Sequence, residues 1–167
     1  ILFLKLLEAQ LLNYHADNDA YSFLDIKKIR NYDDLEFVFL EVLARKYSGR
    51  KKEALTTFKN VPYLNSSLFE LTELEHATIS ISNLRDDKPL SIFKSTVLKD
   101  STGKRLTGSF NTIEYLFRFL DAYDFSNEGS EKIQEEKKTL INASVLGLIF
   151  EKINGYKDGS FFTPGFI

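Results

Sequence analysis

The chain of 167 residues is long enough for one ordinary domain, and its hydrophobic (43%) and charged (28%) shares argue against a disordered polymer or a membrane span. The absence of cysteine excludes disulfides, thiolate metal sites and cysteine nucleophiles, and the two histidines leave little material for a zinc site. The formal net charge of −2 provides no global attraction to nucleic acid, so such a contact would require a local basic patch.

Hydrophobic spacing predicts a first helix that ends near His15. Its expected apolar stripe consists of Leu4, Leu7, Leu11 and Tyr14. Lys5 and Glu8 fall elsewhere on the helix, and they make the apolar opening too charged to span a bilayer. Because the chain contains no methionine and this opening lacks the features of a secretory signal, we interpret the chain as a piece of a longer cytoplasmic protein with no membrane contact.

A second helix is predicted after a turn-rich link at residues 16–19, with Asn31 or Asp33 as its cap. Its expected core face consists of Leu35, Val38, Phe39, Val42 and Leu43. Phe37 and Leu40 lie off this face, so the helix is expected to be covered on more than one side. Gly49 is expected to end it, and a short amphipathic turn with Leu55 and Phe58 follows.

Two stretches favour β structure. Residues 78–82 alternate between polar and apolar side chains, and residues 95–98 are rich in β-branched side chains. Residues 100–104 have the composition of a turn. We therefore expect a small β insertion near residues 77–108, which must pack on helices because two or three short strands bury little by themselves.

Two more helices are predicted downstream. Asn111 or Thr112 caps the third, which ends near Ala122, and a charged surface loop occupies residues 124–138. The last helix begins at Asn142 or Ser144 and carries a stripe formed by Leu146, Ile149, Phe150 and Ile153. The expected fold is mostly α, a helical bundle-like domain with a small antiparallel β hairpin inserted, and its fifteen phenylalanines should dominate the interior.

Two short patterns are candidates for chemistry. Glu135-Glu136-Lys137 matches part of a metal-dependent nuclease pattern, but it stands in a polar, helical stretch that is better explained as a solvated face. Glu75-His76 pairs an imidazole with a carboxylate, yet no second histidine or acidic cluster completes a site. His15 is explained by its place near a helix C-terminus. We therefore predict no catalytic residue and no metal site in this chain.

Two basic clusters are candidates for contact with DNA phosphates. The first consists of Lys27, Lys28 and Arg30, and the second of Arg50, Lys51 and Lys52. Basic runs of this size are common on soluble surfaces, and neither cluster has the interleaved aromatic residues of a platform for single strands. Surface solubility is therefore the commoner explanation, and DNA contact stays an alternative.

Three segments carry a resemblance to a known family. Residues 62–70 read P-Y-L-N-S-S-L-F-E, residues 145–151 read V-L-G-L-I-F-E, and residues 159–164 read G-S-F-F-T-P. In type, order and spacing these segments resemble those of bacterial Type IIG-like restriction-modification enzymes, which join DNA cleavage and adenine methylation in one polypeptide. The resemblance covers roughly the last 110 residues.

This resemblance implies a helical connector that precedes the methyltransferase core, with a connector domain at residues 1–155 and the start of the methyltransferase domain at 156–167. Phe161, Phe162, Thr163 and Pro164 would help line the S-adenosylmethionine pocket in the intact parent only. The family often has tyrosine at the first two of these positions. The G-x-G cofactor loop and the N-P-P-[YF] motif of the family do not occur in this sequence.

From the resemblance we expect a non-catalytic connector of a parent that methylates adenine with S-adenosylmethionine and cleaves DNA with Mg²⁺. No cofactor is expected in the chain itself, and its partners would be the flanking nuclease and methyltransferase domains, with DNA as partner of the parent. The alternatives are a freestanding helical protein-interaction domain, whose F-F-T-P segment is coincidental, and a nonspecific DNA-binding module.

Overall fold

A computed structural model gives the fold, and it describes residues 1–64, 69, 71–78, 80–125, 139–141 and 144–148. This part of the chain is mostly α-helical with a small antiparallel sheet, which confirms the predicted fold class. The helical elements are α1 (Leu2–Tyr14), η1 (Asp19–Tyr21), α2 (Tyr32–Phe37), η2 (Val38–Leu43), η3 (Tyr47–Gly49), α3 (Lys52–Thr57), α4 (Glu73–Thr78), η5 (Ile81–Asn83) and α5 (Thr112–Asp121). The strands are β1 (Leu90–Ser91), β2 (Ser109–Phe110), β3 (Tyr123–Asp124) and β4 (Thr139–Leu140).

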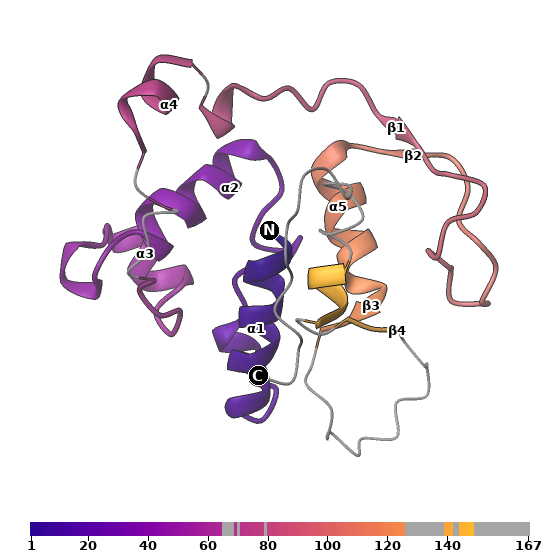
Figure 1. Ribbon diagram of the computed structural model, residues 1–167, viewed down its shortest axis with the longest axis horizontal. Helices are drawn as coiled ribbons and strands as arrows, with labels where there is room; N and C mark the ends of the chain where they lie inside the picture. The colour runs from indigo at the N-terminus through magenta and orange to yellow at the C-terminus, as the bar shows by residue number, and fades with distance from the viewer. Residues whose placement is uncertain (65–68, 70, 79, 126–138, 142–143, 149–167) are drawn as a thin grey trace, which may run out of the picture.

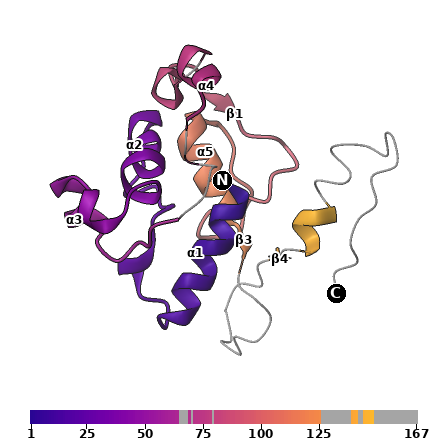
Figure 2. The ribbon, with the colours of Figure 1, turned by 60° about the vertical axis from the view of Figure 1, so that its left-hand side comes forward.

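The helices form two groups that share one core. Figure 1 shows α1, α2 and α3 together and α5 across from them, with α4 and a long connection passing over the top to β1. In the turned view of Figure 2, α5 lies beside α2 and above α1. A single cluster of buried side chains joins the two groups, since Leu4, Leu35 and Phe117 all belong to it.

Helix α1 has the predicted length but a different buried face. Its buried side chains are Leu4, Leu6 and Glu8, whereas Tyr14 of the predicted stripe is 84% exposed. The burial is confined to the first half of the helix because only this half lies between the α2 group and α5. The expectation that Glu8 lies away from the core is therefore wrong.

Glu8 is a buried carboxylate that organises the segment after η1. Its side chain is 1% exposed, and its Oε1 accepts hydrogen bonds from the Ser22 hydroxyl (3.0 Å) and from the amides of Phe23 and Leu24 (both 2.6 Å). These bonds pin an extended turn against α1 and place the fully buried Phe23 and Leu24 in the core. A buried charge is tolerated only with such partners.

Lys5 provides the counter-charge for Glu8 and connects α1 to α5. Its Nζ lies 2.9 Å from Glu8 Oε2 and 3.0 Å from Asp121 Oδ1, and it donates to the Leu24 carbonyl at 3.2 Å. Burial by itself lowers the pKa of the Lys5 ammonium, but the attraction of Glu8 and Asp121 outweighs it and raises the pKa above its ordinary value. The ammonium is therefore held in its charged form.

We predict that Glu8→Ala lowers the free energy of unfolding by about 3–5 kcal/mol, because it leaves a part-buried ammonium and two buried amides without their acceptor. Urea unfolding followed by circular dichroism measures this. Gln10→Ala, at an exposed site of the same helix, is the control and should change stability by less than about 0.5 kcal/mol. Equal losses in the two variants would contradict the role assigned to Glu8.

The second helix begins as predicted but changes form halfway. Asn31 is the cap, and its Oδ1 accepts from the Asp34 amide at 2.8 Å. From Val38 the helix continues as the π-helical segment η2, where the Ala44 amide donates to the Phe39 carbonyl five residues earlier at 3.0 Å. Gly49 does not end this helix, because η2 stops at Leu43 and the glycine closes the separate turn η3.

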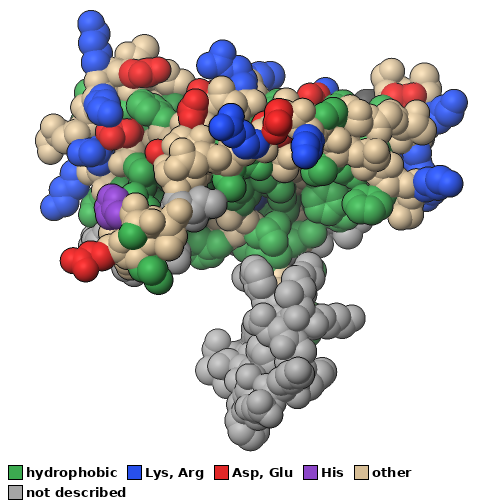
Figure 3. All heavy atoms as spheres, turned by 90° about the horizontal axis from the view of Figure 1, so that it is seen from above, with side chains coloured by type: hydrophobic (Ala, Val, Ile, Leu, Met, Phe, Trp, Pro, Cys, Tyr) green, Lys and Arg blue, Asp and Glu red, His purple; other side chains and the backbone are tan. Residues whose placement is uncertain are grey.

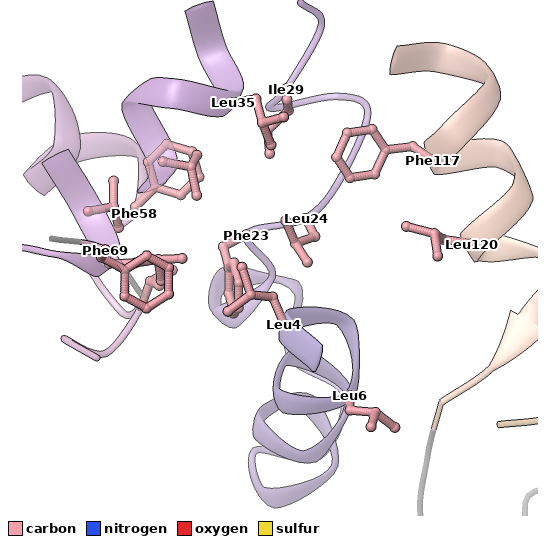
Figure 4. Close-up of a cluster of buried hydrophobic side chains, with 14 of the residues drawn as sticks. Leu4, Leu6, Phe23, Leu24, Ile29, Leu35, Phe58, Phe69, Phe117 and Leu120 are labelled. Atoms are coloured by element: carbon pink, nitrogen blue, oxygen red, sulfur yellow. The ribbon is translucent and has the colours of Figure 1, made fainter. Parts of the chain in front are cut away.

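Phenylalanine dominates the large core side chains, as the composition predicts. Figure 4 shows Phe117 and Leu120 projecting from α5 toward Leu24 and Leu35, with Phe58 and Phe69 on the opposite side of the cluster. The predicted core residues of α2 and η2 are buried, except that Phe39 is half-buried against Phe69 (ring centroids 5.7 Å apart). Phe37, which lies off the predicted face, packs 6.5 Å from the Phe58 ring and is therefore covered within this domain.

The predicted strand at residues 78–82 is wrong. Helix α4 extends to Thr78, and the turn η5 begins at Ile81. The serines of this stretch bind α2 instead of a neighbouring strand: the Ser80 hydroxyl and the Ser82 amide (2.8 Å) both donate to Glu36 Oε2. The polar positions of the alternating pattern are therefore ligands of a carboxylate.

These hydrogen bonds, first that from Ser80 and then that from Ser82, lower the pKa of Glu36. The ionised carboxylate consequently stabilises the fold above its unfolded pKa of about 4.3, and this contribution is lost as the pH falls toward the lower folded pKa. We predict that Glu36→Gln unfolds about 0.5–1 kcal/mol more easily at pH 7, and that the difference disappears near pH 3. Denaturant unfolding across this pH range tests it, with Glu53→Gln, at an exposed site, as the control.

The antiparallel insertion spans residues 90–110, later in the chain than the predicted 77–108. β1 and β2 pair with Leu90 opposite Phe110, and beyond them Lys99 pairs with Arg105 across a hairpin. Residues 100–104 form its turn, as predicted: Gly103 has a φ of +79°, and the Asp100 carboxylate accepts from the Thr102 hydroxyl (2.6 Å) and amide (2.9 Å) and from the Lys104 amide (3.0 Å). The bonds from Thr102 and Lys104 lower the pKa of Asp100.

Helix α5 follows its prediction closely. Asn111 is its cap, with Oδ1 accepting from the Glu114 amide at 2.7 Å, and the helix ends at Asp121. β3 then pairs with β4 in parallel, Tyr123 opposite Thr139. Residues 144–148 are helical with Leu146 buried, as expected for the last helix, while Ile149, Phe150 and Ile153 lie outside the described residues.

Candidate functional site

The first basic cluster is largely engaged within the fold. Lys28 Nζ donates to the carbonyls of Ser22 (2.5 Å) and Asp19 (3.3 Å), which closes the segment that Glu8 pins from the other side. Arg30 Nε lies 3.1 Å from Asp34 Oδ2. Of the three predicted phosphate contacts, Lys27 alone is exposed without an ion pair among the described residues.

Arg50 of the second cluster is a structural residue. It is 7% exposed, its Nε donates to the Arg45 carbonyl (3.2 Å), and its Nη1 donates to the carbonyls of Phe58 (3.3 Å) and Val61 (2.8 Å). Burial lowers the pKa of the guanidinium, although arginine stays charged at neutral pH. The side chain thus satisfies carbonyls at the end of η2 and around α3, and it is not available to a phosphate on the surface.

Lys51 and Lys52 differ in their surroundings. Lys51 Nζ lies 3.1 Å from Glu41 Oε1, and Arg45 Nε lies 2.9 Å from Glu41 Oε2, so one carboxylate of η2 holds two cations. Lys52 is exposed and enters no ion pair among the described residues. The two sequence clusters therefore do not combine into one basic surface.

We predict that Arg50→Ala lowers the free energy of unfolding by about 2–3 kcal/mol, since it leaves three carbonyls without their donor. The neighbouring Lys52→Ala is the matched control and should stay within about 0.5 kcal/mol of the parent. Thermal or urea unfolding measures both changes. A similar effect of the two substitutions would show that Arg50 contributes no more than a surface lysine.

The candidate pair Glu75-His76 belongs to a helix start. The Glu75 carboxylate accepts from the Thr72 amide and hydroxyl (both 2.8 Å), while the Glu75 amide donates back to the Thr72 hydroxyl at 3.2 Å. This is a capping box, and its bonds from Thr72, the backbone bond first, lower the pKa of Glu75. The carboxylate is occupied in beginning α4, as a structural interpretation of the pair requires.

Other predicted site residues fall outside the described residues. These are Glu135, Glu136 and Lys137 of the nuclease-like pattern, and Phe161, Phe162, Thr163 and Pro164 of the cofactor segment. Within the described ranges, no group of three or more His, Asp or Glu side chains is placed to hold a metal ion. None of the helices in these ranges has the length and hydrophobicity that a bilayer crossing requires.

The largest hollow in the described part is an open groove of about 840 Å³ between the hairpin and the C-terminal half of α5. We call it the basic groove, because Lys99 and Arg105 line one wall and Arg118 the other. Arg118 Nε lies 2.7 Å from Glu114 Oε1, and its guanidinium carbon lies 4.7 Å from the centre of the Phe110 ring. Asp121, also in the lining, is the partner of Lys5.

Sequence reasoning missed this groove because its cations are not contiguous. Lys99 and Arg105 are six positions apart and Arg118 lies in another element. A signal was nevertheless present: the turn at residues 100–104 implies a hairpin, and a hairpin places Lys99 opposite Arg105. Pairing the flanks of a predicted turn would have found the pair.

The fold and these sites define a small, mostly α-helical domain with an inserted hairpin. Residues 1–141 match the family model DUF7814, a domain of unknown function, and the chain belongs to this family. The matched span includes all described elements from α1 through β4. Comparisons with curated proteins and with solved structures find no match.

Proposed function

We propose that this chain is a non-catalytic helical connector of a restriction-modification enzyme that methylates adenine in DNA with S-adenosylmethionine and cleaves DNA. The observation that carries the proposal is the ordered set of segments at residues 62–70, 145–151 and 159–164, each of which resembles a segment of that family. The parent is a cytoplasmic bacterial protein with Mg²⁺ as the cofactor of cleavage. The partners of the connector are the flanking nuclease and methyltransferase domains.

A connector must hold two active sites at a fixed separation, and the packing of this domain suits that task. Lys5 lies within ion-pair distance of both Glu8 in its own helix and Asp121 at the end of α5, so the beginning of the chain is attached to a helix more than a hundred residues later. The shared core joins the same two groups of helices. A polar attachment on top of a common core resists bending between the groups.

In this proposal the domain comprises residues 1–155, and residues 156–167 begin the methyltransferase domain. Phe161, Phe162, Thr163 and Pro164 would contribute to the S-adenosylmethionine pocket once the following sheet is present. The family match covers residues 1–141 and so ends before this segment. The proposal assigns no catalytic step to the described residues.

Calorimetry with S-adenosylmethionine tests the proposal, on this chain and on a longer piece of the parent that extends through the next few hundred residues. We expect binding by the longer piece alone, because four residues without the rest of the pocket provide too little contact. Phe162→Ala in the longer piece should weaken binding about tenfold or more, and Tyr47→Ala, at an exposed site of the connector, is the control.

Absence of binding by both proteins would contradict the proposal and favour a freestanding protein-interaction domain. Binding by the 167-residue chain alone would also overturn it, since the chain would then contain a complete pocket. The sequence downstream gives an independent test: a strand with a G-x-G loop followed by N-P-P-[YF] is expected.

A further inference from the structure

The hairpin is the most positively charged stretch of the described chain. Residues 94–106 contain four basic residues and one acidic residue, a formal charge of +3 within a chain whose net charge is −2. The basic residues are Lys94, Lys99, Lys104 and Arg105, and all four are exposed. Figure 3 shows Lys and Arg side chains gathered at the end of the molecule that carries the hairpin, on the right of that view. A local positive field therefore exists on a molecule of nearly balanced charge.

Two of these cations are held side by side. Lys99 and Arg105 oppose each other, and the flanking bonds from the Leu106 amide to the Leu98 carbonyl and from the Asp100 amide to the Lys104 carbonyl (both 2.9 Å) mark a non-hydrogen-bonded pair. In such a pair the side chains leave the same face of the hairpin, at the closest cross-strand approach. Like charges directly opposite destabilise a hairpin.

No carboxylate relieves this repulsion within the described part of the chain. The nearest acidic residue along the chain is Asp100, and its carboxylate points into the turn, where it accepts from Thr102 and Lys104. The ion pairs of the described residues include neither Lys99 nor Arg105. An unfavourable arrangement that the fold maintains is expected to be relieved by an anionic ligand.

The pair faces a surface that can receive such a ligand. Lys99 and Arg105 both line the basic groove, and Arg118 of α5 adds a third cation from the opposite wall. The groove is open along the hairpin, and Lys94 and Lys104 stand beyond its lining at the base and the tip. Charges spaced along an open groove match a chain of phosphates better than one small anion, which exposed cations hold weakly.

We propose that the basic groove binds the phosphodiester backbone of duplex DNA, with Lys99 and Arg105 as its principal contacts. Duplex is favoured over single-stranded DNA because the groove lining has one aromatic residue, the half-buried Tyr123, and so lacks a platform for stacked bases. Contacts of this kind fix position and carry no sequence preference. The inference does not depend on the connector proposal, because it concerns a surface of the described domain alone.

The test is fluorescence anisotropy of a short labelled duplex of arbitrary sequence with the 167-residue chain, from about 50 to 200 mM salt. The variant Lys99→Glu/Arg105→Glu should lose about tenfold or more in affinity, and the slope of log K against log salt should become shallower by about 2. The control Lys27→Glu/Lys52→Glu makes the same change in net charge at two exposed lysines without ion pairs, and should lose less than about threefold.

Equal losses in the two variants would overturn the proposal, since net charge alone would then explain binding. A larger loss in the control, or no binding by the unaltered chain at the lowest salt, would also overturn it. Circular dichroism verifies folding, and Lys99→Gln/Arg105→Gln replaces the Glu variant if that variant does not fold. Cofactor calorimetry and DNA anisotropy are separate readouts, so either proposal can fail without the other.

Discussion

The structure depends on one buried carboxylate. Glu8 accepts three hydrogen bonds from residues 22–24 and faces Lys5, and Lys5 in turn reaches Asp121 at the end of α5. A charge in this position is costly to bury, so every partner must be in place at once. The result is a contact that specifies one arrangement of α1, the following turn and α5, whereas the surrounding leucines and phenylalanines could pack in more than one way.

The helices were predictable because their signals are local. Asn31 and Asn111 each cap a helix three residues before the amide they bind, and the core spacing of α5 repeats within ten residues. Glu8 was not predictable, since its partners lie fourteen to sixteen residues away and a charged residue in a helix is normally at the surface. The alternation at residues 78–82 failed for a related reason: its serines satisfy Glu36, more than forty residues earlier.

The candidate sites show the same limit. Contiguity in sequence suggested two basic clusters, yet Arg50 is buried among carbonyls and Lys28 and Lys51 are engaged with neighbours. The fold instead assembles a basic surface from Lys99, Arg105 and Arg118, which no window of the sequence contains. Charge in a sequence therefore locates cations, and hydrogen-bond acceptors elsewhere decide which of them stay free.

The π-helical segment η2 has a consequence for how this chain tolerates insertions and deletions. A π-helical turn accommodates one residue more than an α-helical turn, so η2 (Val38–Leu43) is equivalent to an α-helix with an inserted residue. Deleting one residue there would regularise the helix but rotate everything after it by about 100°. Val42 and Leu43 would leave the core, and Arg50 would leave its carbonyls. Length in this segment should therefore be more strictly maintained than amino-acid identity.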